Sequence, residues 1–523
     1  MDDTRPRTWI SRLEAASERA NPMLVRCVRQ ELRSRAFVGS FSVLLVVSLL
    51  SACSVAWWTL TGNAVGNEQS GRALFGVLAC AWSCAVVVIQ GTGTFRAVSQ
   101  ERNDDTWDLV DLTGMGPRRI VLGLMHANLV QGILFTAPIA PFMVMAYMLR
   151  GLDLLTILFA LVVVPFFAVA SSALAVLTAS LSQQKASRAT LGGLLGIVLL
   201  GFWLMSFSLW FGLGSGIDYY LSQLRRGDGE TWLLTGFVFN LWVVAVVFML
   251  VLSGALLSHP AANRSTGPRL MSAIVWANAL AWACGTIVWL IVGAGSVANA
   301  ERECAGVAGV FTMLAMWWVM LVSLFAVTED FTLSPRQARA IQDPKPMKRA
   351  LMVVFGPGAT RGRLWYLLFA GLTMAAGMVG VALFDHKDVT MFVLAAWYSL
   401  CYWSILLLVT DALYRGPFSS VFDTPAMRRV CVVLSLLVWG LAPILVGMFL
   451  DPVDFSDTVA CLVSPFTGTA YLANETGKHP TGAITVSLAG ITAMVVLGYQ
   501  GTRLAIVTRR VTAENAGRAA PRT

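Results

Sequence analysis

The chain has 523 residues, of which 57% are hydrophobic and only 13% are charged. Soluble domains are about half apolar and about a quarter charged, so this composition excludes an ordinary soluble protein. The formal net charge is +9, but the basic residues flank long apolar segments. This arrangement is typical of membrane proteins, and no nucleic-acid partner is expected.

Residues 1–35 precede the first apolar segment and contain eight arginines. Asn21 followed by Pro22 is a helix-start signal, because asparagine caps a helix and proline suits its first position. The following residues alternate between an apolar face and arginines, which predicts a cytosolic amphipathic helix on the membrane surface. The alternative is a soluble helix packed on the protein's own loops.

Twelve apolar segments are long enough to cross a bilayer, since about 20 helical residues span a core of roughly 30 Å. The sequence therefore predicts an all-α polytopic membrane protein with about twelve transmembrane helices. The segments lie at 36–58, 73–95, 120–149, 154–181, 190–213, 232–257, 271–297, 305–327, 364–384, 389–410, 431–450 and 481–502.

The basic residues predict the orientation of these helices. With a cytosolic N-terminus, 31 of the 38 Lys and Arg residues fall on the cytosolic side. Basic residues are retained in the cytosol, so both termini are expected there. Arginine outnumbers lysine 33 to 5, which favours a GC-rich bacterial genome and hence the bacterial inner membrane.

The predicted spans divide the chain into four parts: cytosolic amphipathic helices at 1–35, a first six-span unit at 36–257, a second at 258–510, and a cytosolic tail at 511–523. A faint repeat supports two six-helix units. The sequence Ala-Val-Ser-Gln-Glu at 97–101 follows the second span, and Ala-Val-Thr-Glu-Asp at 326–330 follows the eighth.

Signals for chemistry within the spans are few. The segments as bounded above contain no Asp, Glu, Lys or Arg, which counts against an ion-coupled carrier. His126 is the titratable candidate, and a satisfied interfacial histidine is the alternative. Uncharged polar residues in spans either join helices or bind cargo, and they are Gln90, Asn128, Gln131, Asn240 and Asn278. Prolines should kink their helices at Pro138, Pro141, Pro165 and Pro443.

No enzyme motif is recognisable. The sequence contains no G-x-x-x-x-G-K-[ST] motif that would cradle phosphates. The glycine-rich stretch 356–363 has the wrong spacing and no lysine, and it predicts a turn before the ninth span. Neither a catalytic triad nor a metal-ligand pattern is visible, so no catalytic, metal or cofactor site is expected in this chain.

The cytosolic loop 96–119 contains the sharpest local pattern. Asn103 and Asp104 predict a helix start, and the acidic residues that follow suit its first turn. About two helical turns would then present Trp107, Leu109, Val110 and Leu112. Apolar residues on a cytosolic loop indicate a partner surface, with contact to lipid headgroups as the alternative.

This loop resembles that of the permease subunits of ABC-2 type transporters. Their loop after the second span has the order E-R-x-x-x-T-x-[DE]-L-[LV]-x-x-[ST], then a turn, a hydrophobic residue and a glycine. The leader from Asn21 to Arg26 is also similar, and the resemblance covers about residues 20–257. The matching loop residues are Glu101, Arg102, Thr106, Asp108, Leu109, Val110, Thr113, Ile120 and Gly123.

The sequence also departs from the family pattern at two places. Leu124 stands where the family usually has Lys or Arg after the glycine, and residues 328–336 are only a partial copy of the loop. In the family, the loop docks on a separate ATPase. The resemblance therefore implies coupling residues at Glu101, Arg102, Thr106, Trp107, Asp108, Leu109, Val110 and Leu112.

The resemblance implies a permease subunit that exports a substrate with energy from a separate cytosolic ABC ATPase, which would bind the ATP and magnesium. The lipid bilayer is the other partner, and a second permease or a second copy of the chain would complete the pathway if one chain does not. The competing interpretations are a membrane scaffold or assembly subunit, an ion-coupled secondary carrier, and a membrane enzyme acting on lipids.

Overall fold

The structure is a computed structural model, and it describes most of the chain. The described residues are 22–61, 67–103, 116–149, 152–181, 185–207, 210, 214–259, 262–330, 333–335, 337, 341, 346–384, 386–415, 424–450, 463–474 and 480–518.

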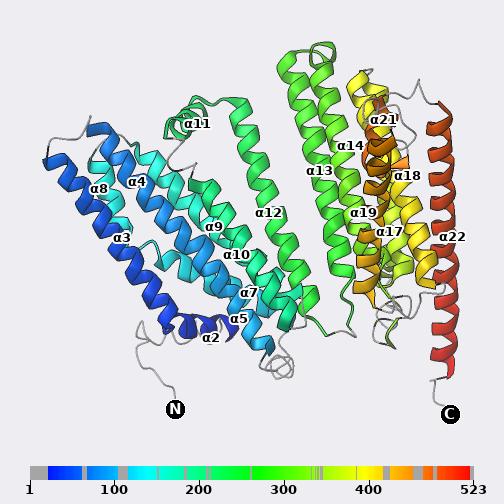
Figure 1. The fold of residues 1–523 in the computed structure, drawn as a ribbon, viewed down its shortest axis with the longest axis horizontal. Helices are drawn as coiled ribbons and strands as arrows, with labels where there is room; N and C mark the ends of the chain where they lie inside the picture. The colour runs from blue at the N-terminus through cyan, green and yellow to red at the C-terminus, as the bar shows by residue number, and fades with distance from the viewer. Residues whose placement is uncertain are drawn as a thin grey trace, which may run out of the picture. The chain divides into compact units, whose positions relative to one another are not determined.

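All regular elements of the described residues are helices (Figure 1). In the first half they are α2 (Pro22–Leu32), α3 (Arg35–Leu60), α4 (Asn67–Cys84), η1 (Ala85–Ile89), α5 (Gln90–Asn103), α7 (Pro117–Leu134), α8 (Ala140–Met148), α9 (Leu154–Leu181), α10 (Lys185–Phe207), α11 (Gly214–Arg226) and α12 (Gly229–Leu257). In the second half they are α13 (Thr266–Ala294), α14 (Val297–Val327), α16 (Pro346–Phe355), α17 (Ala359–Leu383), α18 (Lys387–Arg415), α19 (Pro425–Leu450), α21 (Pro465–Asn474) and α22 (Pro480–Arg518).

Eleven stretches of described helix are long and apolar enough to cross a membrane. They coincide with eleven of the twelve predicted spans, so the chain is an all-α, multi-pass membrane protein. The remaining predicted span, 120–149, is divided into α7 and α8 by turns at residues 135–139. Pro138 lies in this break and Pro141 in the first turn of α8. Proline cannot donate a backbone hydrogen bond, which accounts for the interruption.

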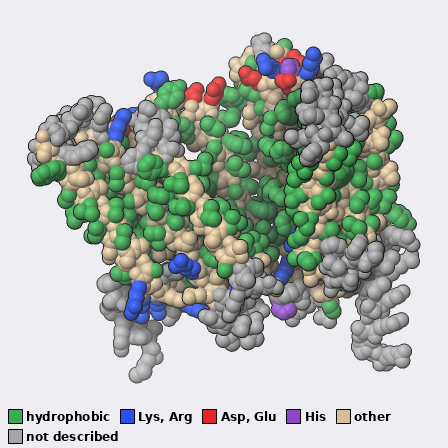
Figure 2. All heavy atoms as spheres, in the orientation of Figure 1, with side chains coloured by type: hydrophobic (Ala, Val, Ile, Leu, Met, Phe, Trp, Pro, Cys, Tyr) green, Lys and Arg blue, Asp and Glu red, His purple; other side chains and the backbone are tan. Residues whose placement is uncertain are grey.

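Large hydrophobic side chains are exposed along the long helices, as Figure 2 shows. On α12, for example, Leu234, Val238 and Leu241 are each 56% exposed. A surface of this kind is unfavourable in water and favourable against lipid chains.

The chain divides into two compact units, Met1–Ser258 and His259–Thr523, here called unit 1 and unit 2. In unit 1, α9 packs against α5, α7 and α12. The short helix α2 lies along α7 and buries Met23, while Arg26 and Arg29 on its other faces are exposed. Helix α2 is therefore amphipathic, and its apolar side packs on α7. Residues 1–21 of the predicted cytosolic helices lie outside the described residues.

In unit 2, α14 packs against α13, α17 and α18, and α18 also packs against α22. The core between them is rich in aromatic residues, and Trp365 and Tyr366 are fully buried there. In both units the second and fourth long helices pack together, and the fourth packs against the sixth. The two units therefore repeat one helix-packing scheme.

The second long helix of unit 1 contains one irregular turn. Residues Ala85–Ile89 form a π-helical turn, in which the backbone amide of Gln90 bonds to the carbonyl oxygen of Ala85. A π turn holds one more residue than the α-helical turn it replaces. The helix continues through it from α4 into α5 and ends at Asn103.

Candidate functional site: buried arginines at the helix ends

The predicted coupling segment begins where α5 ends. Glu101 and Arg102 lie in the last turn of α5, whose backbone is described. The other predicted coupling residues lie outside the described residues, and they are Thr106, Trp107, Asp108, Leu109, Val110 and Leu112. Their docking role therefore stays a prediction.

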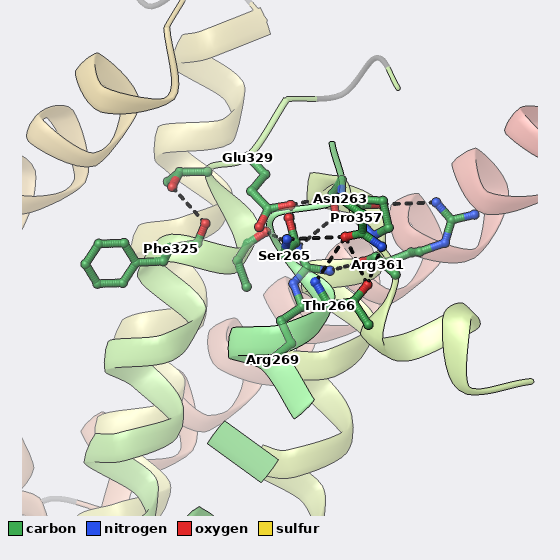
Figure 3. Close-up of polar contacts among 12 residues, drawn as sticks. Asn263, Ser265, Thr266, Arg269, Phe325, Glu329, Pro357 and Arg361 are labelled. Atoms are coloured by element: carbon green, nitrogen blue, oxygen red, sulfur yellow. Dashed lines mark hydrogen bonds and ion pairs between the residues drawn. The ribbon is translucent and has the colours of Figure 1, made fainter. Parts of the chain in front are cut away.

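In unit 2, Arg269 joins three segments (Figure 3). This residue near the start of α13 is 3% exposed, and its Nη2 lies 2.8 Å from Oε2 of Glu329, beyond the end of α14. Arg269 also donates to the carbonyl oxygens of Ala326 and Gly358, each at 3.1 Å, and to that of Gly356. Oε2 of Glu329 accepts a further bond, of 2.9 Å, from the backbone amide of Gly358. The ends of α13 and α14 are thus tied to the turn before α17.

The glycines of this turn permit the close approach. Gly358 has a φ of +101°, which side chains rarely tolerate. At Gly356 an added Cβ would lie 2.3 Å from the carbonyl oxygen of Met352. At Gly362, one turn into α17, it would lie 2.0 Å from the carbonyl oxygen of Ala326. The turn predicted at 356–363 is confirmed only for residues 356–358, because α17 begins at Ala359 and residues 359–363 are helical.

Two arginines of α19 also bind the end of α14. Nη1 of Arg428 donates to the carbonyl oxygen of Glu329 at 3.1 Å and lies 3.5 Å from Oδ1 of Asp330. Nε of Arg429 donates to Oγ1 of Thr328 at 3.2 Å, and its guanidinium lies 5.1 Å from the ring centre of Phe325. Positive groups at a helix C-terminus compensate its partial negative charge, so the end of α14 is stabilised electrostatically.

A buried ion pair joins α17 and α18. Arg363 and Asp411 are bonded through Nη2 and Oδ1, with side chains that are 0% and 4% exposed. Nη1 of Arg363 also donates to Oε1 of Gln500 on α22 at 2.6 Å. Both charged residues lie within helices that could span a membrane. The predicted spans at 364–384 and 389–410 exclude both residues, whereas the membrane-length helices of the structure extend far enough to include them.

Unit 1 repeats one of these contacts. Arg188, near the start of α10, is 6% exposed, and its Nη1 donates to the carbonyl oxygen of Ser99 on α5 at 3.3 Å. Ser99 and Glu329 both belong to the two similar sequence segments, 97–101 and 326–330. In each unit, an arginine that begins the fifth long helix thus binds a carbonyl group near the end of the second.

The polar residues predicted within the spans differ in burial. Gln90 is 2% exposed, and its Nε2 donates to the carbonyl oxygen of Asn128 on α7, so these two residues join their helices. Gln131 is buried one turn further along α7. His126 is exposed on the same helix, and its Nδ1 lies 2.6 Å from the carbonyl oxygen of Leu122. The predicted role in joining helices is confirmed for Gln90.

The buried charges escaped the sequence analysis because each lies at the edge of an apolar segment. Arg361 and Arg363 directly precede the ninth predicted span, and Asp411 directly follows the tenth. Adjacent to a membrane, such residues are usually interfacial. The signal that could have found the pair is the isolated carboxylate at position 411, because the apolar helical pattern continues beyond it to Tyr414.

Within the described part of the chain, no three His, Cys, Asp or Glu residues are grouped so that they could hold a metal ion. Comparison with known protein families, with curated proteins and with solved structures finds no match to this chain.

Proposed function

We propose that this chain is the membrane permease subunit of an ABC-2-like exporter in a bacterial inner membrane. A separate cytosolic ATPase binds ATP and magnesium and supplies the energy. The coupling segment 104–113 docks on that ATPase and passes its movement to the membrane helices.

The observation that carries this proposal is the position of the motif. The second long helix of unit 1 continues without interruption from the membrane segment to Asn103. The sequence that follows has the residue order of the ABC-2 coupling loop. In the sequence the proposed docking segment directly follows this helix, so a movement of the segment would act on the helix.

The segment offers both apolar and polar contacts to a partner. Burying a large apolar side chain stabilises an interface by about 1.5–3 kcal/mol. Trp107, Leu109 and Leu112 would supply most of this burial, whereas Glu101 and Arg102 would set the orientation through polar contacts.

The substitution Leu109→Asp tests the proposal. We expect it to weaken ATPase association or to separate hydrolysis from transport, while expression and membrane insertion stay normal. The matched control is Val297→Asp. Val297 is the first residue of α14, and its side chain is 46% exposed. Normal association and transport with Leu109→Asp would refute the docking role. ATP hydrolysis by the purified chain alone would refute the two-subunit arrangement.

A second candidate, an ion-coupled carrier, is favoured by the buried pair of Arg363 and Asp411. Intramembrane charged residues often mark the path of a coupling ion. Transport assays in vesicles separate the two candidates. An ionophore that collapses the ion gradient stops a carrier, whereas ATP depletion at a constant gradient stops the exporter.

A further inference from the structure

Helices α5 and α10 of unit 1 meet along a continuous line of contacts, which we call the α5–α10 seam. A Cβ added to Gly91 would lie 2.8 Å from Cδ1 of Leu199. One turn later on α5 and two turns earlier on α10, a Cβ added to Gly192 would lie 2.6 Å from Cε1 of Phe95. One further turn along, Arg188 binds the carbonyl oxygen of Ser99.

The order of these contacts shows that the two helices run antiparallel at close range. Positions 91, 95 and 99 follow one face of α5, because residues four apart lie above one another on a helix. The glycines allow the helices to approach until Leu199 and Phe95 are 2% and 9% exposed. Close-packed surfaces transmit displacement, so α5 and α10 should move together.

Arg188 occupies the cytosolic end of the α5–α10 seam. Ser99 lies one turn before the end of α5 and two residues before Glu101, where the predicted coupling residues begin. A guanidinium that donates to a carbonyl group there compensates the negative end of the helix dipole. The contact therefore fixes the direction in which α5 leaves unit 1.

The corresponding contact in unit 2 has different neighbours. Arg428 binds the carbonyl oxygen of Glu329 in the same way, but Arg269 and Arg429 also bind the residues around the end of α14. The sequence after Asp330 is only a partial copy of the coupling loop. Arg428 thus repeats the local chemistry of Arg188 without the predicted docking segment.

We propose that Arg188 is a positioning residue, which holds the end of α5 on α10 so that movement of the coupling segment enters the membrane helices along the α5–α10 seam. This inference rests on the proposed function. In this proposal, the contacts between α5 and α10 transmit the movement. The side chains that would touch the ATPase are a separate set.

The first test measures the end of α5 without any partner. Hydrogen–deuterium exchange of the full chain in lipid nanodiscs would compare Arg188→Gln with Arg428→Gln. We expect exchange at the amides of 97–103 to become roughly tenfold faster in Arg188→Gln, since hydrogen bonds to charged groups are among the stronger ones. The same amides should be unchanged in Arg428→Gln. Unchanged exchange in Arg188→Gln overturns the proposal.

The second test measures transmission, with the ATPase that copurifies with the wild-type chain. The readout is the hydrolysis rate of the complex divided by that of the isolated ATPase. In Arg188→Gln and in Gly192→Ala we expect this ratio to fall to about one with unchanged binding. Gly193→Ala is the matched control, because an added Cβ there meets nothing within 4 Å.

The outcomes separate the inference from the proposed function. Loss of ATPase binding in Arg188→Gln would show a docking role and overturn the positioning role, as would a wild-type hydrolysis ratio in that variant. If the wild-type chain binds no ATPase, the proposed function fails, and the exchange experiment alone shows whether Arg188 orders the end of α5.

Discussion

Breaking the ion pair between Arg363 and Asp411 should strongly destabilise unit 2. The two side chains are 0% and 4% exposed, so solvent screens their interaction little. In Arg363→Met the carboxylate of Asp411 stays buried without its guanidinium partner, which typically costs about 3–5 kcal/mol. For a unit of this size, that cost corresponds to a decrease of roughly 6–20 °C in melting temperature.

The assay is thermal unfolding of the purified chain in one fixed detergent, followed by size-exclusion chromatography. The double variant Arg363→Met/Asp411→Leu should recover most of the loss, because apolar residues of similar volume often replace a buried ion pair without cost. The control is Arg225→Met. Its ion pair with Asp153, 2.7 Å long, has side chains 58% and 59% exposed, and such pairs contribute about 0–1 kcal/mol.

Two results would refute this reasoning. The first is an Arg363→Met variant that loses no more stability than Arg225→Met. The second is a double variant that is no more stable than the single one. If the double variant also keeps transport activity, the pair is structural and no longer favours the ion-coupled carrier.

Three further predictions follow from other features. Gly362→Ala should lower the melting temperature, because its Cβ would collide with a carbonyl oxygen, whereas Gly371→Ala on the same helix should not, because the space there is open. In a cysteine-free background, Arg226→Cys should react with a membrane-impermeant reagent from outside and Thr424→Cys should not; the reverse would overturn the orientation. Hydrogen bonds from a threonine hydroxyl and then from its backbone amide lower the pKa of Asp228, the N-cap of α12. A lowered pKa gives stability that is present above the ordinary value and lost as the pH falls through the folded value. The melting-temperature difference between wild type and Asp228→Ala should therefore shrink below about pH 4, and a constant difference would contradict the cap.

The sequence predicts the long helices well because hydrophobic length is a local property. It predicts their ends less well, and the ends decide the chemistry here. The ninth span was expected at 364–384, whereas α17 begins at Ala359 and includes Arg363. A span drawn from hydropathy ends where the first charged residue occurs, even when the helix continues beyond it. Whether such a charge faces water or a partner depends on Asp411, which lies 48 residues away.

Arg188 shows the same limit in unit 1. In the sequence it is one more basic residue on the cytosolic side, and its contact with Ser99 spans 89 residues. The break between α7 and α8 was foreseeable, because proline lacks the donor that a helix needs. By contrast, the π turn at 85–89 consists of Ala, Val and Ile, whose composition carries no local signal for the irregular hydrogen bonding.

The position of the π turn sets the register of the rest of the second helix of unit 1. Its surplus residue lies at the start of the α5–α10 seam. If that residue moved toward Asn103, each residue it passed would rotate by roughly 100° and shift by about 1.5 Å. Phe95 would then move away from Gly192, and Ser99 would move away from Arg188. The helix axis would not need to tilt. Cysteines at positions 95 and 192 cross-link only in the register of the structure. If a second register is populated, the disulfide yield should be incomplete in the full-length chain and complete after deletion of Val87; equal yields in the two chains would exclude a second register.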